Sequence, residues 1–291
     1  MKSFILLILV HLASVQLIIT QSLIVNEVSQ GSGYSEYVEL LVTGPVSCNP
    51  VNTLDLQGWI FDDNNGHFNT GSGTGIASGV CRFAYDPFWS AIPVGTIIVI
   101  YNSSSPNSSL PADDISMSDG NCKLVIPISS NLFDKRTGQP STSNSSYPTS
   151  GWASGGDWSC ISMNNSYDSF QIRDPLNMAN PVHSVSWGNN TNGTIIYFSG
   201  SASGTVFYFD NSISDDSFNQ NNWSSGSVPG SETPGSPNNS ANQAWINTLN
   251  NNCSPPPVAD AGNDVTICEG ESTTLNASGG SGSANYTWNQ G

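Results

Sequence analysis

Asp62, Asp63 and Asn64 are the residues best suited to hold a metal ion, because three oxygen-bearing side chains follow one another in a single polar turn. Carboxylate and amide oxygens are the ligands that Ca²⁺ prefers. The spacing does not fit an EF-hand, since Gly66 falls one position early and no Glu follows at the twelfth position. We therefore expect either an irregular Ca²⁺ site or a hydrated turn here, and we expect the fold to require no cofactor.

A second group of residues has side chains suited to sugars. Trp152, Asp157 and Trp158 lie in a stretch rich in Gly and Ser, and aromatic rings beside polar groups fit the faces of carbohydrates. Long loops on a rigid frame are common binding sites. These residues form a candidate glycan site. The alternative is that the indoles pack in the interior, as we expect for Trp89, Trp187 and Trp223.

Catalytic patterns are absent from the sequence. Beyond the first residues only His67 and His183 occur, and there is no HExxH, GxSxG or P-loop motif. We expect His67 to be a turn residue and His183 to be a partly buried, hydrogen-bonded residue on a strand. The sequence therefore predicts no catalytic residues and a chain that is not an enzyme.

The first residues have the form of an export signal. Lys2 precedes an apolar run from Phe4 to Ile19, which ends at polar Thr20. The run is shorter than the roughly 20 residues of a spanning helix. We expect residues 1–21 to be a signal peptide, the protein to be secreted or on the cell surface, and the mature chain to have no membrane span.

Cysteines outside the cell are expected to form disulfides. The six structural cysteines are Cys48, Cys81, Cys122, Cys160, Cys253 and Cys268. They are widely spaced and include no CxxC pair, which argues against zinc. The sequence does not choose among the possible pairings.

Composition restricts the partners. The net charge is −16, and only 10% of residues are charged. Such a chain repels nucleic acid, so we expect a cell-surface or extracellular polymer or protein as partner, with a glycan as one possibility.

Short runs of β-branched and aromatic residues separated by turn residues predict an all-β sandwich or barrel. The expected strands are Leu23–Val28, Tyr37–Val42, Trp59–Phe61, Ile97–Tyr101, Lys123–Ile128, Ser169–Ile172, His183–Trp187, Thr194–Phe198 and Thr205–Phe209. Residues 102–111 and 137–156 are expected to be long surface loops. A short helix is expected over Ala241–Leu249, with a capping box at Ser240 and Gln243 and with Ala241, Ala244, Trp245 and Leu249 on its apolar side.

The ordered motifs of residues 23–238 resemble a bacterial lamin-tail domain. The motifs are Ile24-Val25-Asn26-Glu27, Tyr37-Val38-Glu39-Leu40, Leu54 to Asp62 with Gly58-Trp59, Ile92 to Gly95, Ser169 to Pro175, His183 to Gly188 and Thr233-Pro234-Gly235-Ser236-Pro237-Asn238. This resemblance implies an immunoglobulin-like β-sandwich with long insertions over residues 22–240. Glu27 and Glu39 then lie on neighbouring strands. They face either solvent, which we favour, or backbone amides or a cation.

Residues 258–291 resemble the start of a polycystic-kidney-type or gliding-associated immunoglobulin-like repeat, with Ala259 to Glu271 as the matching run. Residues 241–257 are expected to hold the short helix and a proline-rich linker. The chain is then expected to stop inside a second module. In such repeats the counterpart of Cys268 often pairs with a later cysteine, so the resemblance implies that Cys253 and Cys268 need not be partners.

These expectations combine into one functional hypothesis. The chain is predicted to be a non-catalytic exported surface or matrix module that acts in adhesion or scaffolding. Two alternatives stay open: a module that targets a larger secreted hydrolase to a substrate or glycan, and an enzyme with its site in the inserted loops.

Overall fold

The computed structural model describes residues 22–44, 52–63, 80–136, 147, 149–157, 160–178, 181–188, 195–250 and 274. In this part the chain is mostly β, with one short α-helix. The strands are β1 (Leu23–Ser29), β2 (Tyr37–Val42), β3 (Thr53–Leu54), β4 (Ile60–Asp62), β5 (Val80–Phe83), β6 (Ile92–Pro93), β7 (Ile97–Tyr101), β8 (Lys123–Pro127), β9 (Phe133–Arg136), β10 (Ala153–Ser154), β11 (Asp168–Arg173), β12 (His183–Trp187), β13 (Ile196–Phe198), β14 (Thr205–Phe209) and β15 (Trp223–Ser227).

The strands form three open sheets. The first sheet has six strands in the order β15-β14-β1-β2-β7-β8, and the second has seven in the order β10-β9-β5-β4-β11-β12-β13. A small third sheet pairs β3 with β6. Neighbouring strands are antiparallel except for the pairs β7–β8 and β12–β13.

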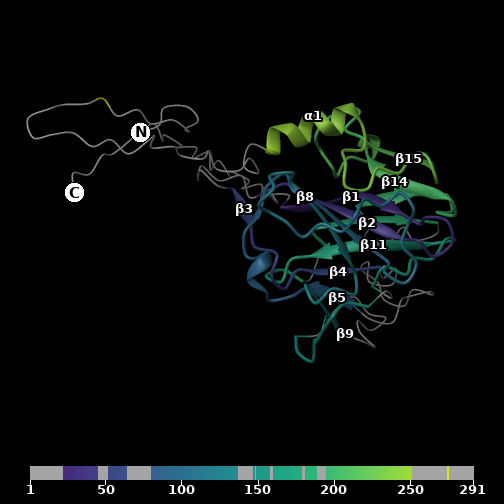
Figure 1. Ribbon diagram of the computed structural model, residues 1–291. Coiled ribbons are helices and arrows are strands. Elements are labelled where there is room, and N and C mark those ends of the chain that lie inside the picture. The colour runs from purple at the N-terminus through teal and green to yellow at the C-terminus, as the bar shows by residue number, and fades with distance from the viewer. Residues whose placement is uncertain are drawn as a thin grey trace, which may run out of the picture.

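The two large sheets face each other, as in a β-sandwich. In Figure 1 the helix α1 (Ser240–Leu249) lies above the first sheet, and β11, β4, β5 and β9 of the second sheet lie below it. One core of apolar side chains fills the space between the sheets and contains Trp59, Phe61, Trp89 and Trp187. Phe61, Phe83, Trp89 and Phe133 pack edge to face at its centre. Burial of this apolar surface is the main driving force for the fold.

All nine strands expected from the sequence are present, with small shifts at their ends. The structure adds β3, β5, β6, β9, β10 and β15. Residues 137–156 do not form only a surface loop, since they include β10 and the buried Tyr147.

The predicted helix exists, but two details were wrong. Its N-cap is Asn239 and not Ser240, because the Asn239 side chain accepts hydrogen bonds from the backbone N–H groups of Ala241 and Asn242. Its buried residues are Asn242 and Ile246, while Ala244 is exposed. The helix is therefore rotated relative to the predicted apolar side. Trp245 still contacts Phe209 of β14, with the ring centroids 5.4 Å apart.

Within the described ranges, no helix has both the length and the apolar character needed to cross a bilayer. The expected signal peptide, linker and second module lie outside these ranges, apart from Thr274.

Candidate functional site

All three arginines of the chain lie on the outer face of the second sheet. Arg82 on β5 and Arg173 on β11 are both cross-strand partners of Ile60. Arg136 on β9 is the partner of Val80. Cross-strand partners point to the same face of a sheet, and Ile60 and Val80 pack together in a small apolar cluster outside the main core. The arginines therefore share one face of a chain whose net charge is −16.

Each arginine contacts a different part of one segment that runs across this face. We call Tyr147 together with residues 149–152 the crossing segment. The guanidinium of Arg173 lies 5.0 Å from the ring centroid of Tyr147, and that of Arg82 lies 4.4 Å from the ring of Trp152. Between them, Arg136 donates a hydrogen bond to the carbonyl oxygen of Ser150. Arginine suits this role because its planar cation both stacks on rings and donates hydrogen bonds.

A buried polar network fixes the Tyr147 end of the crossing segment. The Tyr147 hydroxyl donates to Asp62 Oδ2 at 3.1 Å and accepts from Gln171 Nε2 at 2.8 Å. Arg173 Nε donates to Gln171 Oε1 at 3.0 Å. Burial raises the pKa of Asp62 to about 8, although the Tyr147 hydrogen bond and the nearby Arg173 lower it. Asp62 therefore has a structural role in holding this segment.

Asp62 and Asp63 have different surroundings. Burial raises the pKa of Asp63 well above its usual range, and the neighbouring carboxyls of Asp168, Asp62 and Glu36 raise it further. Both carboxylate oxygens of Asp63 are buried and have no hydrogen-bond partner in the described part of the chain. No set of three or more His, Cys, Asp or Glu side chains among the described residues is arranged to hold a metal ion. Asn64 lies outside the described residues, so the Ca²⁺ site stays a prediction.

A hollow of about 150 Å³ opens where the crossing segment ends on this face. Its lining includes Gly58, Arg82, Tyr85, Thr149, Trp152 and Met178. The Arg82 guanidinium contacts two rings, since its distance to the Tyr85 centroid is 4.8 Å and to the Trp152 centroid 4.4 Å. Asp134 fixes the same guanidinium, with Nη2 and Oδ2 2.8 Å apart. The hollow thus combines aromatic faces with a fixed pair of charges.

Gly58 permits the position of Tyr85. Its φ is +78°, in the region that favours glycine, and a Cβ there would lie 2.6 Å from the Tyr85 hydroxyl oxygen. The chain turns tightly at Gly58, and Trp59 is buried in the core.

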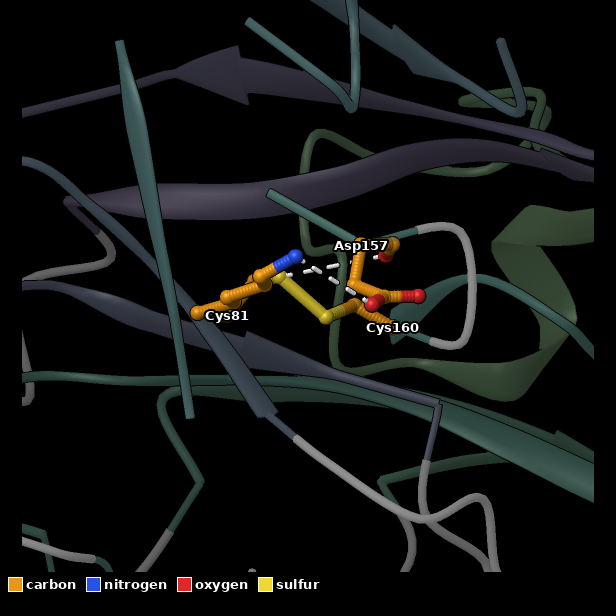
Figure 2. Close-up of a disulfide and its surroundings, with 4 residues drawn as sticks. Cys81, Asp157 and Cys160 are labelled. Carbon is orange, nitrogen blue, oxygen red and sulfur yellow. Dashed lines mark hydrogen bonds and ion pairs between the residues drawn. A yellow bond between two sulfur atoms is a disulfide. The ribbon is translucent and has the colours of Figure 1, made fainter. Parts of the chain in front are cut away.

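The structure separates the predicted glycan residues. Trp152 lines the hollow, whereas Asp157 pairs with Lys135 at 3.5 Å. Figure 2 shows Asp157 beside the Cys81–Cys160 disulfide, with its carbonyl oxygen 3.9 Å from the Cys81 sulfur. Trp158 lies outside the described residues. Arg82 and Tyr85 were missed, although three arginines in an acidic chain are a visible signal.

The disulfide confirms part of the cysteine prediction. Cys81 and Cys160 are bonded across a sequence separation of 79 residues. Cys122 is a free thiol in the described part of the chain. The prediction for Cys48, Cys253 and Cys268 falls outside the described residues.

A second polar cluster covers the outer face of the first sheet. Glu27 and Glu39 are cross-strand partners on β1 and β2, and both are fully buried. The expectation that they face solvent was wrong, because the segment from Glu232 to Asn242 covers them. We call Glu27, Glu39 and this segment the glutamate latch. The alternative, that these carboxyls meet backbone amides, is correct.

Hydrogen bonds from Thr233, Gly235 and Asn238 hold the latch on the first sheet. The backbone N–H and the hydroxyl of Thr233 donate to Glu27 at 3.0 and 2.7 Å, and the N–H of Gly235 donates to Glu39 Oε2 at 2.7 Å. Asn238 Nδ2 donates to the carbonyl oxygens of Asn26 and Phe209 at 3.0 and 2.8 Å. Three of the seven motifs behind the lamin-tail resemblance, those that contain Glu27, Glu39 and Thr233, therefore meet at one place.

Burial raises the pKa of Glu27 to about 7, although hydrogen bonds from Tyr37 and Thr233 oppose this rise. Burial and the adjacent Glu27 raise the pKa of Glu39 well above its usual range. The pair thus holds a proton more tightly than exposed glutamates do. These carboxyls therefore have a structural role in the sandwich.

His183 has the structural role that was expected, with deeper burial. It is fully buried, its Nε2 lies 3.2 Å from the carbonyl oxygen of Ser217, and Phe218 and Trp223 lie on its ring. Burial lowers its pKa to about 4, so the ring is neutral near pH 7. His67 lies outside the described residues.

Comparisons with known proteins yield only distant similarity. No protein-family model matches the chain. No curated protein matches it. A crystal structure of a DUF4876 family protein from Bacteroides thetaiotaomicron is similar, with 12% identity and a TM-score of 0.38. That similarity covers 66% of this chain and 63% of the other, which is less than two thirds of the other protein's length. It assigns neither a family nor a function to this chain.

Proposed function

We propose that this chain is a non-catalytic module of lamin-tail, immunoglobulin-like type, exported to the cell surface or matrix, where it acts in adhesion or scaffolding. The proposal depends on one observation: all three arginines hold the crossing segment against the outer face of the second sheet. A rigid sheet that presents a fixed segment with the half-buried ring of Trp152, beside the exposed ring of Tyr85, is suited to binding by surface contacts.

The buried ionisable groups support the same proposal. Glu27, Glu39, Asp62 and His183 each form hydrogen bonds that hold a strand or a covering segment in place. Two side chains that follow strands of the second sheet differ from these buried groups, since Tyr85, after β5, is 64% exposed and Leu176, after β11, is 93% exposed. Tyr85, Trp152, Pro175 and Met178 line one hollow, and apolar side chains gathered at one site on a surface favour a contact role.

The test is a disruption of the gene in the producing organism. We expect the disrupted strain to lose attachment to its usual surface or matrix, and the wild-type gene to restore it. A copy with Tyr34→Ala, which removes an exposed ring from the turn after β1, should restore attachment as well as the wild type. Unchanged attachment in the disrupted strain would reject the proposal.

A further inference from the structure

We infer that the hollow lined by Arg82, Tyr85 and Trp152 binds one sugar unit of a neutral polysaccharide. This inference rests on the proposed function, because it names the polymer that the surface module contacts. The size of the hollow gives the first argument. Sites that enclose a whole small ligand have volumes of roughly 300–1,000 Å³, whereas this hollow measures about 150 Å³. The hollow fits one sugar unit of a polysaccharide whose other units lie across the protein surface.

The lining gives the second argument. Sugar rings present C–H faces that pack on aromatic rings and hydroxyls that need hydrogen-bond partners. Tyr85 and Trp152 supply the rings, and the Arg82–Asp134 pair and Thr149 supply donors and acceptors. Arg82 uses Nε and Nη2 to reach Asp134 Oδ2. A guanidinium has five N–H donors, so this pairing leaves the remaining donors able to meet a hydroxyl.

The charges at the hollow and on the whole protein favour an uncharged polymer as the ligand. The only cation that lines the hollow, among the described residues, is Arg82, and its charge is balanced by Asp134 at 2.8 Å. The whole chain has a net charge of −16, and a polyanion would be repelled from such a surface. A polymer of uncharged sugars avoids this repulsion and uses both partners of the ion pair.

The hollow is formed before a ligand arrives. Arg82 is on β5, between β4 and β9, and its guanidinium is fixed by Asp134 and by both rings. Gly58 leaves room for the Tyr85 hydroxyl. Binding to a fixed site loses less side-chain freedom than binding to a flexible one. A single aromatic ring in this place can therefore make a measurable difference to affinity.

The test is affinity electrophoresis of the purified chain in gels that contain one polysaccharide each. The neutral probes are hydroxyethylcellulose, arabinoxylan, galactomannan and a β-1,3-glucan, and alginate is the anionic probe. We expect at least one neutral probe to retard the wild-type chain. Tyr85→Ala should weaken that retardation about tenfold, and Trp152→Ala should do the same. Tyr34→Ala removes a ring that is 76% exposed, in the turn after β1 of the first sheet, and it should bind as the wild type does.

Thermal melts of the same samples show whether each variant is folded, and Tyr85 is the main test because its ring is mostly exposed. Retardation by no neutral probe, retardation by alginate alone, or equal binding by folded Tyr85→Ala would each overturn the inference. If no neutral probe binds while the disrupted strain still loses attachment, the sugar inference fails and the proposed function stands. If a neutral probe binds but attachment is unchanged, the proposed function fails alone.

Discussion

Glu27 and Glu39 illustrate how the position of a carboxyl determines its role. A β-bulge between Val25 and Glu27 turns both Asn26 and Glu27 toward the outer face of the first sheet. Asn26 Nδ2 then donates to Glu39 Oε1 at 2.7 Å, and Thr233 reaches Glu27. Without the segment that covers them, both carboxyls would return to water. The latch therefore ties the end of the domain to its first two strands.

The buried carboxyls predict an unusual dependence of stability on pH. A carboxyl whose pKa is raised on folding stabilises the fold below its unfolded pKa, and this stability is lost as the pH rises through the folded pKa. Folding raises the pKa of Glu27 to about 7 and that of Asp62 to about 8. We expect the free energy of unfolding to fall by roughly 1–3 kcal/mol between about pH 6 and 8.5. Urea unfolding at both pH values measures this fall in the free energy of unfolding.

Two variants serve as controls for this pH dependence. Glu27→Gln and Asp62→Asn remove the titrating groups with little change of shape. Each change should therefore reduce the loss of unfolding free energy as the pH rises. His183, whose pKa is lowered to about 4, acts in the opposite direction and mainly below about pH 7. A stability that rises steadily from pH 6 to 8.5 would show that these carboxyls are ionised in the fold.

A substitution at Asn238 tests whether the glutamate latch stabilises the fold, and it leaves the charge unchanged. Asn238→Ala removes the two bonds to the carbonyl oxygens of Asn26 and Phe209. We expect a loss of about 1–3 kcal/mol in unfolding free energy, because buried acceptors are left without donors. Asn247→Ala, on the exposed side of α1, is the matched control and should change stability by less than about 0.5 kcal/mol. Equal effects of the two changes would count against the latch.

At the scale of elements, the Cys81–Cys160 disulfide joins β5 to the chain just before β11. It closes a long stretch of sequence that includes the crossing segment. In the chain-entropy account, a crosslink of this length stabilises the fold by about 4 kcal/mol. The double change Cys81→Ala and Cys160→Ala should therefore lower the unfolding free energy by about that amount in urea titrations. Cys122→Ser should have a much smaller effect, and equal losses would contradict the assigned bridge.

Sequence patterns predicted the strands with continuous apolar runs and missed those without them. β7 (Ile-Ile-Val-Ile-Tyr) has a clear strand pattern. β9 (Phe-Asp-Lys-Arg) and β15 (Trp-Ser-Ser-Gly-Ser) do not, because they are held by neighbours and not by their own apolar content. Only the pairing of distant strands makes these segments regular.

The candidate site was predicted only in part for a related reason. Trp152 stands out in the sequence because a tryptophan in a Gly/Ser-rich stretch is unusual. Its partners Arg82 and Tyr85 lie far from it in sequence, and only the pairing of β5 with β4 and β9 brings them together. Glu27 and Glu39 were placed on the correct strands, but the segment that buries them starts nearly two hundred residues later.

At the scale of the whole molecule, both outer faces of the sandwich are covered. The glutamate latch and α1 cover the first sheet, and the crossing segment covers part of the second. Acidic groups are buried under the first cover, and all three arginines contact the second. At the hollow beside Tyr85, the fixed Arg82–Asp134 pair meets the exposed ring of Tyr85 and the half-buried ring of Trp152.

Export is the claim on which the disulfide, the surface contacts and the sugar site all depend. The most direct measurement treats intact producing cells, and separately their medium, with a broad-specificity protease and identifies the released peptides by mass spectrometry. We predict recovery of a peptide pair joined through Cys81 and Cys160. Recovery of the chain only after cell lysis, with both of these thiols reduced, would contradict the account.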